Sequence, residues 1–282
     1  MVQKKRLWID TDLNPPPASG SRGTFVGANV DDAVALLSAM AHPSVELVGV
    51  STVGSDAERR AAVAVGLLAG AGADLGMVPV VAGAETPGGD VSAVVEAVGA
   101  SGAEALLAIG PLTNVAALTV AGARPPELTL MGGALRPVEH RGETRTVEHN
   151  FGSDPEAAAV VLAEPGAVIV PLDATVAARL DDRLVGRLVA TAPVLEPMVQ
   201  AWLAEWGEVV LHDPAALLVA AGDGTELGKF ERRRLRVDPD GRLIDGGQGA
   251  AGTVHDVVTS LFGSAVVASV LALLADLKVA GS

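Results

Sequence analysis

Short apolar runs alternate along the chain with longer Ala-rich stretches. The apolar runs are rich in Val, Ile and Leu and have the length of strands; they lie at residues 7–10, 47–53, 78–82, 105–109, 128–131 and 168–172. The Ala-rich stretches that follow them have the length of helices. This alternation predicts an α/β fold, in which helices flank both faces of a mostly parallel, open sheet.

Helices are expected near residues 31–41, 56–71, 114–121, 154–163, 183–190, 197–206, 214–221 and 259–276. The last one falls in an uncharged stretch, residues 257–275, that is long enough to be compared with a membrane span. Because that stretch contains Thr, Ser and Gly, a helix buried against the sheet is the preferred interpretation. The sequence Asp238-Pro239-Asp240-Gly241 predicts a hairpin turn between residues 232–237 and 242–244.

Four carboxylates lie close together near the start of the chain. Asp10 and Asp12 end the first predicted strand, and Asp31 and Asp32 open the first predicted helix after a Pro-rich loop at residues 13–30. Acids this close repel one another unless a cation or a proton lies among them, and carboxylates suit Ca²⁺ or Mg²⁺. A helix N-terminus also favours Asp, which is the competing explanation for the second pair. Two further acids at a strand end, where open sheets place ligands, favour a binding site.

Three later segments place polar groups where strands end or helices begin. Gly110-Pro111-Leu112-Thr113-Asn114 exposes carbonyls and Thr113 where a metal could be met, although a Thr cap explains it equally well. Glu148 and Asn150 precede an ordinary Asp-Pro-Glu helix start that does not account for them. His212-Asp213 opens another helix, where capping by Asp213 competes with a functional role. A charged irregular stretch, residues 135–147, is expected on the same rim.

The 282 residues carry a formal net charge of −14 and include no Cys. With 49% apolar residues the chain can bury a large core, so residues 1–282 are expected to form a single domain. The negative charge disfavours nucleic acid and anionic membranes as partners and leaves a small-molecule substrate. The lack of Cys excludes thiolate metal sites and Cys nucleophiles and is compatible with a cytoplasmic location.

Taken together, these motifs resemble the nucleoside hydrolase family in order and spacing over nearly the whole chain. The family's Asp-x-Asp and Asp-Asp signatures match Asp10-Thr11-Asp12 and Asp31-Asp32, and its later motifs match residues 110–114, 131–134, 148–150, 154–158 and 212–214. The resemblance implies a Rossmann-like α/β core and a cytoplasmic homodimer or homotetramer. Its implied activity is hydrolysis of the N-glycosidic bond of ribonucleosides, of the inosine- and uridine-preferring type, as used in purine and pyrimidine salvage.

The same resemblance implies a calcium site and a ribose site. Four oxygen donors would hold Ca²⁺, namely Asp12, Asp32, Asp213 and the main-chain carbonyl of Thr113. Three polar side chains would bind ribose hydroxyls, namely Asp31, Glu148 and Asn150. Asp10 would support the metal ligands.

Catalysis, on this interpretation, needs a base for water and an acid for the departing nucleobase. Asp12 would accept the proton of a water that the metal orients and acidifies. His212 would protonate the base, and His149 is a weaker candidate for that role.

The sequence departs from the family's pattern in segments that bear on recognition of the nucleobase. Eighteen residues, 13–30, separate the two acidic pairs, where the family usually has far fewer. The family's His-Gly loop after the third strand is missing, since residues 83–90 pass straight to an Ala-rich helix, and Ser55 replaces an Asn expected after the second strand. Metal binding is therefore expected to be intact, whereas base recognition is not defined by the sequence.

Two alternatives remain open at this point. A haloacid-dehalogenase-type phosphatase would share Asp10-x-Asp12 after a strand, but it needs a Lys at a later strand end, and Lys229 and Lys278 are far from any such motif. A catalytically silent nucleoside or ribose binder would keep the calcium site without the leaving-group machinery. The missing loop and Ser55 favour the second alternative.

Overall fold

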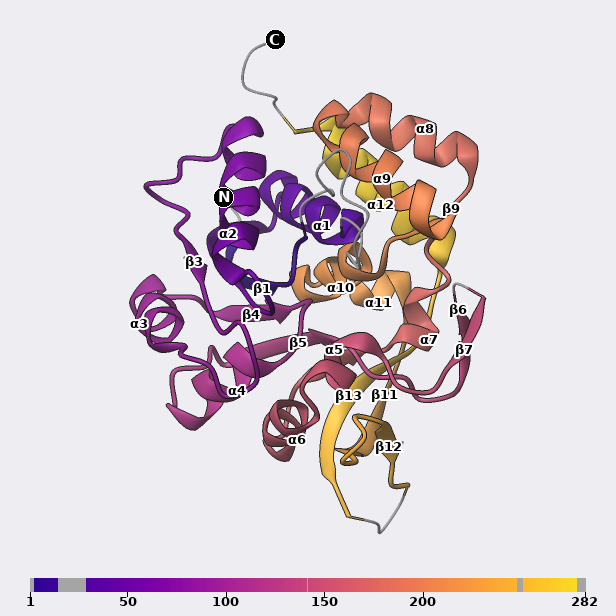
Figure 1. Cartoon of the computed structure of the whole chain (residues 1–282). Coiled ribbons are helices and arrows are strands. Elements are labelled where there is room, and N and C mark those ends of the chain that lie inside the picture. Colours follow the sequence, from indigo (N-terminus) through magenta and orange to yellow (C-terminus); the bar gives the residue numbers. More distant parts are fainter. Residues whose placement is uncertain (1–2, 15–28, 141, 248–250, 278–282) are drawn as a thin grey trace.

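A nine-stranded sheet runs through the part of the chain that the computed structural model describes, residues 3–14, 29–140, 142–247 and 251–277 (Figure 1). Its strands in spatial order are β12 (Leu243–Asp245), β11 (Gly228–Val237), β13 (Thr253–Leu261), β8 (Val168–Val170), β5 (Glu127–Met131), β4 (Ala105–Ala108), β1 (Lys5–Thr11), β2 (Val45–Thr52) and β3 (Val80–Ala82). From β13 to β3 neighbouring strands are parallel, and among the described strands of this sheet only β11 pairs antiparallel, with β12 and β13. The predicted mostly parallel open sheet is confirmed.

Helices cover both faces of the sheet because alternate strand residues point to opposite sides. Leu7 and Ile9 of β1 belong to one apolar cluster with α1 (Val30–Ala41), α2 (Ala57–Gly70), α10 (His212–Ala221) and α12 (Gly263–Ala275). Trp8, between them, belongs to a second cluster with α3 (Ser92–Ser101), α4 (Thr113–Val120) and α6 (Pro155–Ala163). Figure 1 shows these two sets of helices on opposite sides of the sheet.

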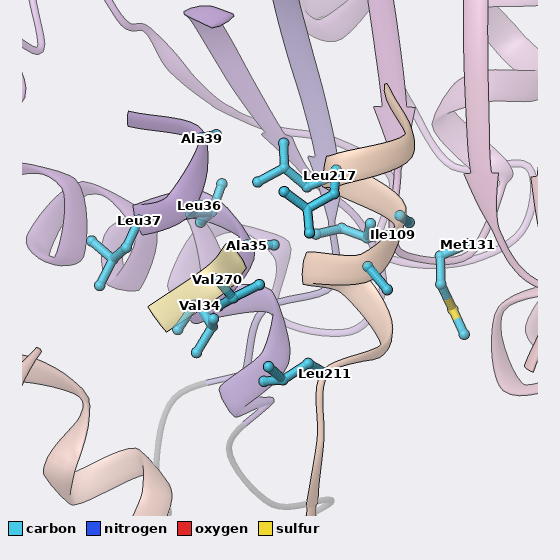
Figure 2. Packing of buried hydrophobic residues seen from close by; sticks show 14 of the residues in the cluster. Val34, Ala35, Leu36, Leu37, Ala39, Ile109, Met131, Leu211, Leu217 and Val270 are labelled. Atoms are coloured by element: carbon cyan, nitrogen blue, oxygen red, sulfur yellow. The ribbon is translucent and has the colours of Figure 1, made fainter. Parts of the chain in front are cut away.

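Helix α1 is buried over most of its length and brings distant parts of the chain together. Figure 2 shows side chains of α1, among them Val34 and Leu36, close to Leu217 of α10 and Val270 of α12. The helix therefore has apolar partners on several sides, which explains why its sequence is almost uniformly apolar after Asp32. Its packing fixes the position of the two acids in its first turn.

Shorter elements complete the described fold. These are the hairpin of β6 (Val138–His140) and β7 (Glu143–Arg145), the pair β9 (Arg179–Leu180) and β10 (Val209–Val210), and the helices α5 (His149–Ser153), α7 (Leu172–Thr175), α8 (Asp182–Thr191), α9 (Glu196–Trp206) and α11 (Gly224–Leu227), with a 3-10 turn at Pro193–Leu195. No helix among the described residues is both long and apolar enough to cross a membrane.

Three expectations from the sequence are corrected. The predicted helix at 259–276 begins too early, because residues 259–261 finish β13, which pairs with β8 and β11, and α12 begins only at Gly263. The stretch 135–147 is not wholly irregular, since it contains the β6–β7 hairpin. The strand at 168–172 ends at Val170, and Leu172 already belongs to α7. Most of the loop at 13–30, residues 15–28, lies outside the described residues.

The hairpin turn at residues 238–241 is confirmed. Asp238 N–H donates to the carbonyl of Arg242 (3.0 Å), and Gly241 has a φ of 84°, which a glycine adopts readily. The turn joins β11 to β12 at one edge of the sheet.

Candidate active site

A cavity of about 450 Å³ opens where β1, β4 and β5 end and α1, α5 and α10 begin. It lies at the carboxyl ends of parallel strands, the position that open α/β sheets use for ligands. Seven of the residues predicted for the site line it, namely Asp12, Asp31, Asp32, Glu148, Asn150, His212 and Asp213. The fold therefore brings together residues that are up to 201 positions apart, from Asp12 to Asp213.

Three buried carboxylates form the centre of the site. Asp31 and Asp32 lie in the first turn of α1 and Asp213 in the first turn of α10, and each offers an oxygen within 4.8 Å of those of the other two. Burial raises the pKa of Asp32 and of Asp213 well above the usual range, and the charges of neighbouring acids, including Asp12, raise both further. Three ionised carboxylates at this spacing repel one another strongly.

A hard divalent cation fits this donor set. The ligands offered are carboxylate oxygens, which Ca²⁺ and Mg²⁺ prefer, and a cation among them would remove the repulsion that raises the pKa values of Asp32 and Asp213. Asp32 is held in place by Thr11, whose hydroxyl donates to it from the end of β1. Asp31, Asp32 and Asp213, with Asp12 beside them in the cavity, are the groups that would hold such an ion.

Asp12 differs from the other acids because it has cationic neighbours. The guanidinium Nη1 of Arg60 lies 3.8 Å from Asp12 Oδ2 and also donates to the Asp12 carbonyl. On the other side, Nε2 of His149 lies 3.6 Å from Asp12 Oδ2, and the interaction with Asp12 raises the pKa of His149. Arg60 comes from α2 and was not foreseen from the sequence. Asp12 and His149 also line a second cavity of about 250 Å³ that contains Ser55.

Asp10 lies beneath the cavity and is fully buried. Its Oδ1 accepts hydrogen bonds from Ser51 Oγ (2.5 Å) and Asn114 Nδ2 (2.8 Å), which ties β1 to β2 and α4. Burial raises the pKa of Asp10 to about 7, against the opposing effect of these hydrogen bonds. Asp10 is therefore a structural neighbour of the ligands and does not line the cavity.

Glu148 and Asn150 are positioned by the start of α5. Glu148 caps this helix, since its Oε1 accepts from the Asn150 N–H (2.8 Å) and its Oε2 from those of Gly133 (2.9 Å) and Phe151 (3.2 Å). Burial raises its pKa. Asn150 Nδ2 donates to the Met131 carbonyl at the end of β5 (3.0 Å), which fixes the amide.

Thr113, whose main-chain carbonyl is the fourth predicted metal ligand, begins α4 after the end of β4. Its hydroxyl donates to Asp154 Oδ2 (2.6 Å), and it lines the second cavity. Ile109, which directly follows β4, lines the main cavity. The carbonyl of Thr113 stays a prediction for the metal site.

His212 opens α10 next to Asp213. It is buried, and its Nδ1 lies 2.7 Å from the hydroxyl of Thr175 on α7. Because Nδ1 is engaged there, the ring is held in one orientation at the wall of the cavity.

Sequence reasoning missed one side of the cavity, formed by α9. Trp202, Glu205 and Trp206 all line it. Residues three and four positions apart share one face of a helix, so the spacing was available as a signal.

Comparison with known proteins agrees with this geometry. The family model described as inosine-uridine preferring nucleoside hydrolase matches residues 7–260. The chain belongs to this family. It is thus a nucleoside hydrolase, an N-glycosyl hydrolase of ribonucleosides, and the phosphatase alternative is wrong. No curated protein matches it in sequence.

Solved structures of nucleoside hydrolases share the fold. A purine-preferring ribonucleoside hydrolase from Gardnerella vaginalis is 20% identical, with 97% of this chain and 99% of that chain covered and a TM-score of 0.75. A plant nucleoside hydrolase is 18% identical, with 96% and 99% covered and a TM-score of 0.72. An inosine-uridine preferring nucleoside hydrolase from Bacillus anthracis is 19% identical, with 97% and 100% covered and a TM-score of 0.71.

Proposed function

We propose that this nucleoside hydrolase requires calcium and cleaves ribonucleosides to ribose and free base through the cavity at the strand ends. The observation that carries the proposal is the buried cluster of Asp31, Asp32 and Asp213 in the same cavity as Asp12. When bound there, the divalent cation supplies the positive charge that orients and acidifies a water molecule.

Ribose binding is proposed for the polar side chains around the cluster. Asp31 and Asn150 present carboxylate and amide oxygens to the cavity, and both can accept hydrogen bonds from ribose hydroxyls. Glu148 already accepts three backbone N–H groups, yet each oxygen of a carboxylate has a second acceptor position that a hydroxyl can use.

The proposed reaction divides the proton transfers between two residues. Asp12 accepts a proton from the attacking water, whose oxygen bonds to the anomeric carbon. The electron pair of the breaking C–N bond moves to the base, and His212 supplies a proton to it. The carboxylates stabilise the positive charge that develops on the ribose. Arg60 and His149 keep Asp12 in place until the water is bound.

Release of free base is the deciding measurement. Purified protein is incubated with inosine or uridine and excess Ca²⁺, and free base is separated by chromatography; the same sample is then treated with a chelator and recharged with Ca²⁺ or Mg²⁺. We expect base release that chelation abolishes and Ca²⁺ restores. Nucleoside binding without base release would instead identify the silent binder, and turnover unaffected by complete chelation would contradict the metal assignment.

The family resemblance also supports a homodimer or homotetramer that acts in the cytoplasm. Light scattering coupled to size-exclusion chromatography measures the assembly directly. A monomer at micromolar concentration would contradict the first of these expectations.

A further inference from the structure

One helix adds aromatic side chains and a further carboxylate to the lining of the main cavity. Helix α9 contributes Trp202, Glu205 and Trp206 to this lining. Trp202 is buried, Trp206 is partly buried and Glu205 is exposed, whereas Asp31, Asp32 and Asp213 are all buried. The cavity is therefore lined both by buried acids and by two indoles with an exposed acid next to them on α9.

The two indoles that line the cavity lie at an angle to each other. Their ring centroids are 6.2 Å apart and their planes are inclined by 55°. The indole N–H of Trp202 donates to the Glu208 carbonyl (2.9 Å), which holds this ring in one orientation. Faces inclined in this way offer negative π-surface to a ligand, and a ligand cation within reach of such faces is stabilised electrostatically.

The charge of the cavity lining also favours a cationic ligand. Among the described lining residues six are carboxylates, namely Asp12, Asp31, Asp32, Glu148, Glu205 and Asp213, and one is an arginine, Arg145. Arg145 belongs to β7, and its charge acts on His149. A divalent cation bound among the acids leaves the lining net negative when these groups are ionised, so the remaining volume favours a positively charged ligand.

We propose that α9 forms a recognition site for a positively charged nucleobase, so that ribonucleosides carrying an alkylated, cationic purine are preferred substrates over their neutral isomers. The inference rests on the proposed function for the ribose end of the cavity. Trp202 and Trp206 contact the faces of the base, and Glu205 pairs with its charge.

Such a base also changes the chemistry of departure. When the C–N bond breaks, its electron pair neutralises the positive ring, and the base leaves as a neutral molecule without receiving a proton. Water adds to the anomeric carbon and gives its proton to Asp12. Cleavage of a cationic substrate thus does not need His212 as an acid.

Two constitutional isomers test the proposal. 1-Methyladenosine has a base that is a cation at neutral pH, and N6-methyladenosine is neutral, with the same ring system and the same added methyl group. Dissociation constants are measured by quenching of Trp fluorescence in the chelated protein, where turnover is absent, and specificity constants are measured by base release in the presence of Ca²⁺. We expect the cation to bind about 2–30-fold more tightly, the range of one cation–π contact from an exposed to a desolvated site.

Variants of α9 separate recognition from intrinsic reactivity. Glu205→Gln and Trp206→Leu are each expected to lower the ratio of the two affinities by about 2–5-fold. Any difference in bond lability between the isomers is common to parent and variants and cancels from the change in ratio. Glu196→Gln is the matched control, because Glu196 is exposed on the same helix, interacts with Gln200 and does not line the cavity.

The outcomes are distinct. Equal binding of the two isomers by the parent overturns the inference. So does a ratio of the two affinities that is the same in Glu205→Gln and in the parent. Glu205 is exposed, so this variant retains the fold. Preferential binding of the cation with no base release from any nucleoside would support the inference while contradicting the proposed function. Base release with no difference in binding between the isomers would support the proposed function and contradict the inference.

Discussion

Asp10 is a carboxyl group that the fold places in surroundings suited to its neutral form. Its Oδ1 accepts two hydrogen bonds, whereas Oδ2 is buried without a hydrogen-bond partner among the described residues. Burial raises its pKa to about 7 from the ordinary 3.8. A raised folded-state pKa contributes stability below the unfolded value, and this stability is lost as the pH rises through the folded value.

Asp10→Asn is therefore expected to stabilise the protein at pH 8 relative to the parent. The amide oxygen can accept from Ser51 and Asn114 as before, and no charge has to be buried. The gain, of order 1–3 kcal/mol, should vanish below about pH 3, where Asp10 is protonated in both states. Chemical denaturation across this pH range measures it. A variant less stable than the parent at pH 8 would mean that burial of the Asp10 carboxylate carries no net cost in the folded protein.

The sugar preference follows from the residues around the acidic cluster. If the metal and Asp31 both contact the 2′ and 3′ hydroxyls, 2′-deoxyinosine loses a metal ligand and leaves buried polar groups unpaired. We expect its specificity constant to be on the order of 10³-fold below that of inosine. Comparable values for the two nucleosides would show that Asp31 and Asn150 do not form the ribose site.

The effect of His212 on the cleavage rate is expected to be largest for substrates whose leaving base must receive a proton. His212→Ala should slow inosine cleavage by roughly 10²–10⁴-fold, the usual effect of general acid catalysis. A nucleoside with an activated leaving group should be affected far less. His149→Ala serves as the comparison, because His149 interacts with Asp12 rather than with Thr175. Equal losses on both substrates would assign His212 a structural role.

At the scale of elements, the site depends on close contact between strand ends. A Cβ on Gly110, which follows β4, would lie 2.8 Å from the Asp12 N–H nitrogen and 2.8 Å from Val53 Cγ1. The backbone that carries Asp12 would have to shift to accept it.

Gly110→Ala is accordingly expected to reduce both stability and metal affinity, with a cost of about 1–3 kcal/mol from overpacking. Thermal melts with and without Ca²⁺ measure both effects. Gly99→Ala is the control, since Gly99 lies within α3 with open space around the added methyl, and there alanine should stabilise by about 0.5–1 kcal/mol. Unchanged calcium affinity in Gly110→Ala would show that Asp12 tolerates displacement.

The elements also show what the sequence could and could not predict. The alternation of short apolar runs and Ala-rich stretches was sufficient for the parallel sheet, and acids at strand and helix ends were sufficient for most of the cavity floor. The uncharged run that joins β13 to α12 was misread because burial makes a strand and a helix equally apolar. Arg60 was missed because tertiary packing brings α2 to Asp12, and the spacing on α9 shows a shared helix face but not that this face lines the cavity.

For the whole molecule, the acidic cluster makes stability depend on the metal. A ligand that binds only the folded state stabilises it by mass action, by about 2.7 kcal/mol when its concentration is 100 times the dissociation constant. We expect chelation at pH 8 to lower the melting temperature of the parent. Asp213→Asn removes one of the repelling charges, so its chelated form should melt above the chelated parent and gain little from added Ca²⁺. Equal gains for parent and variant would place the metal elsewhere.

The distance along the chain between the acids has a consequence for biosynthesis. Asp31 and Asp213 are 182 positions apart, and α1 and α10, which carry them, lie side by side (Figure 1). Contacts of such long range form late, because the entropy of closing the intervening loop is lost before the contact is gained. A nascent chain that has emerged only as far as β8 holds two of the three acids of the cluster and cannot bind the ion as the finished protein does. Metal uptake thus follows the completion of folding, and a shortage of the ion would leave completed chains less stable and more open to proteolysis.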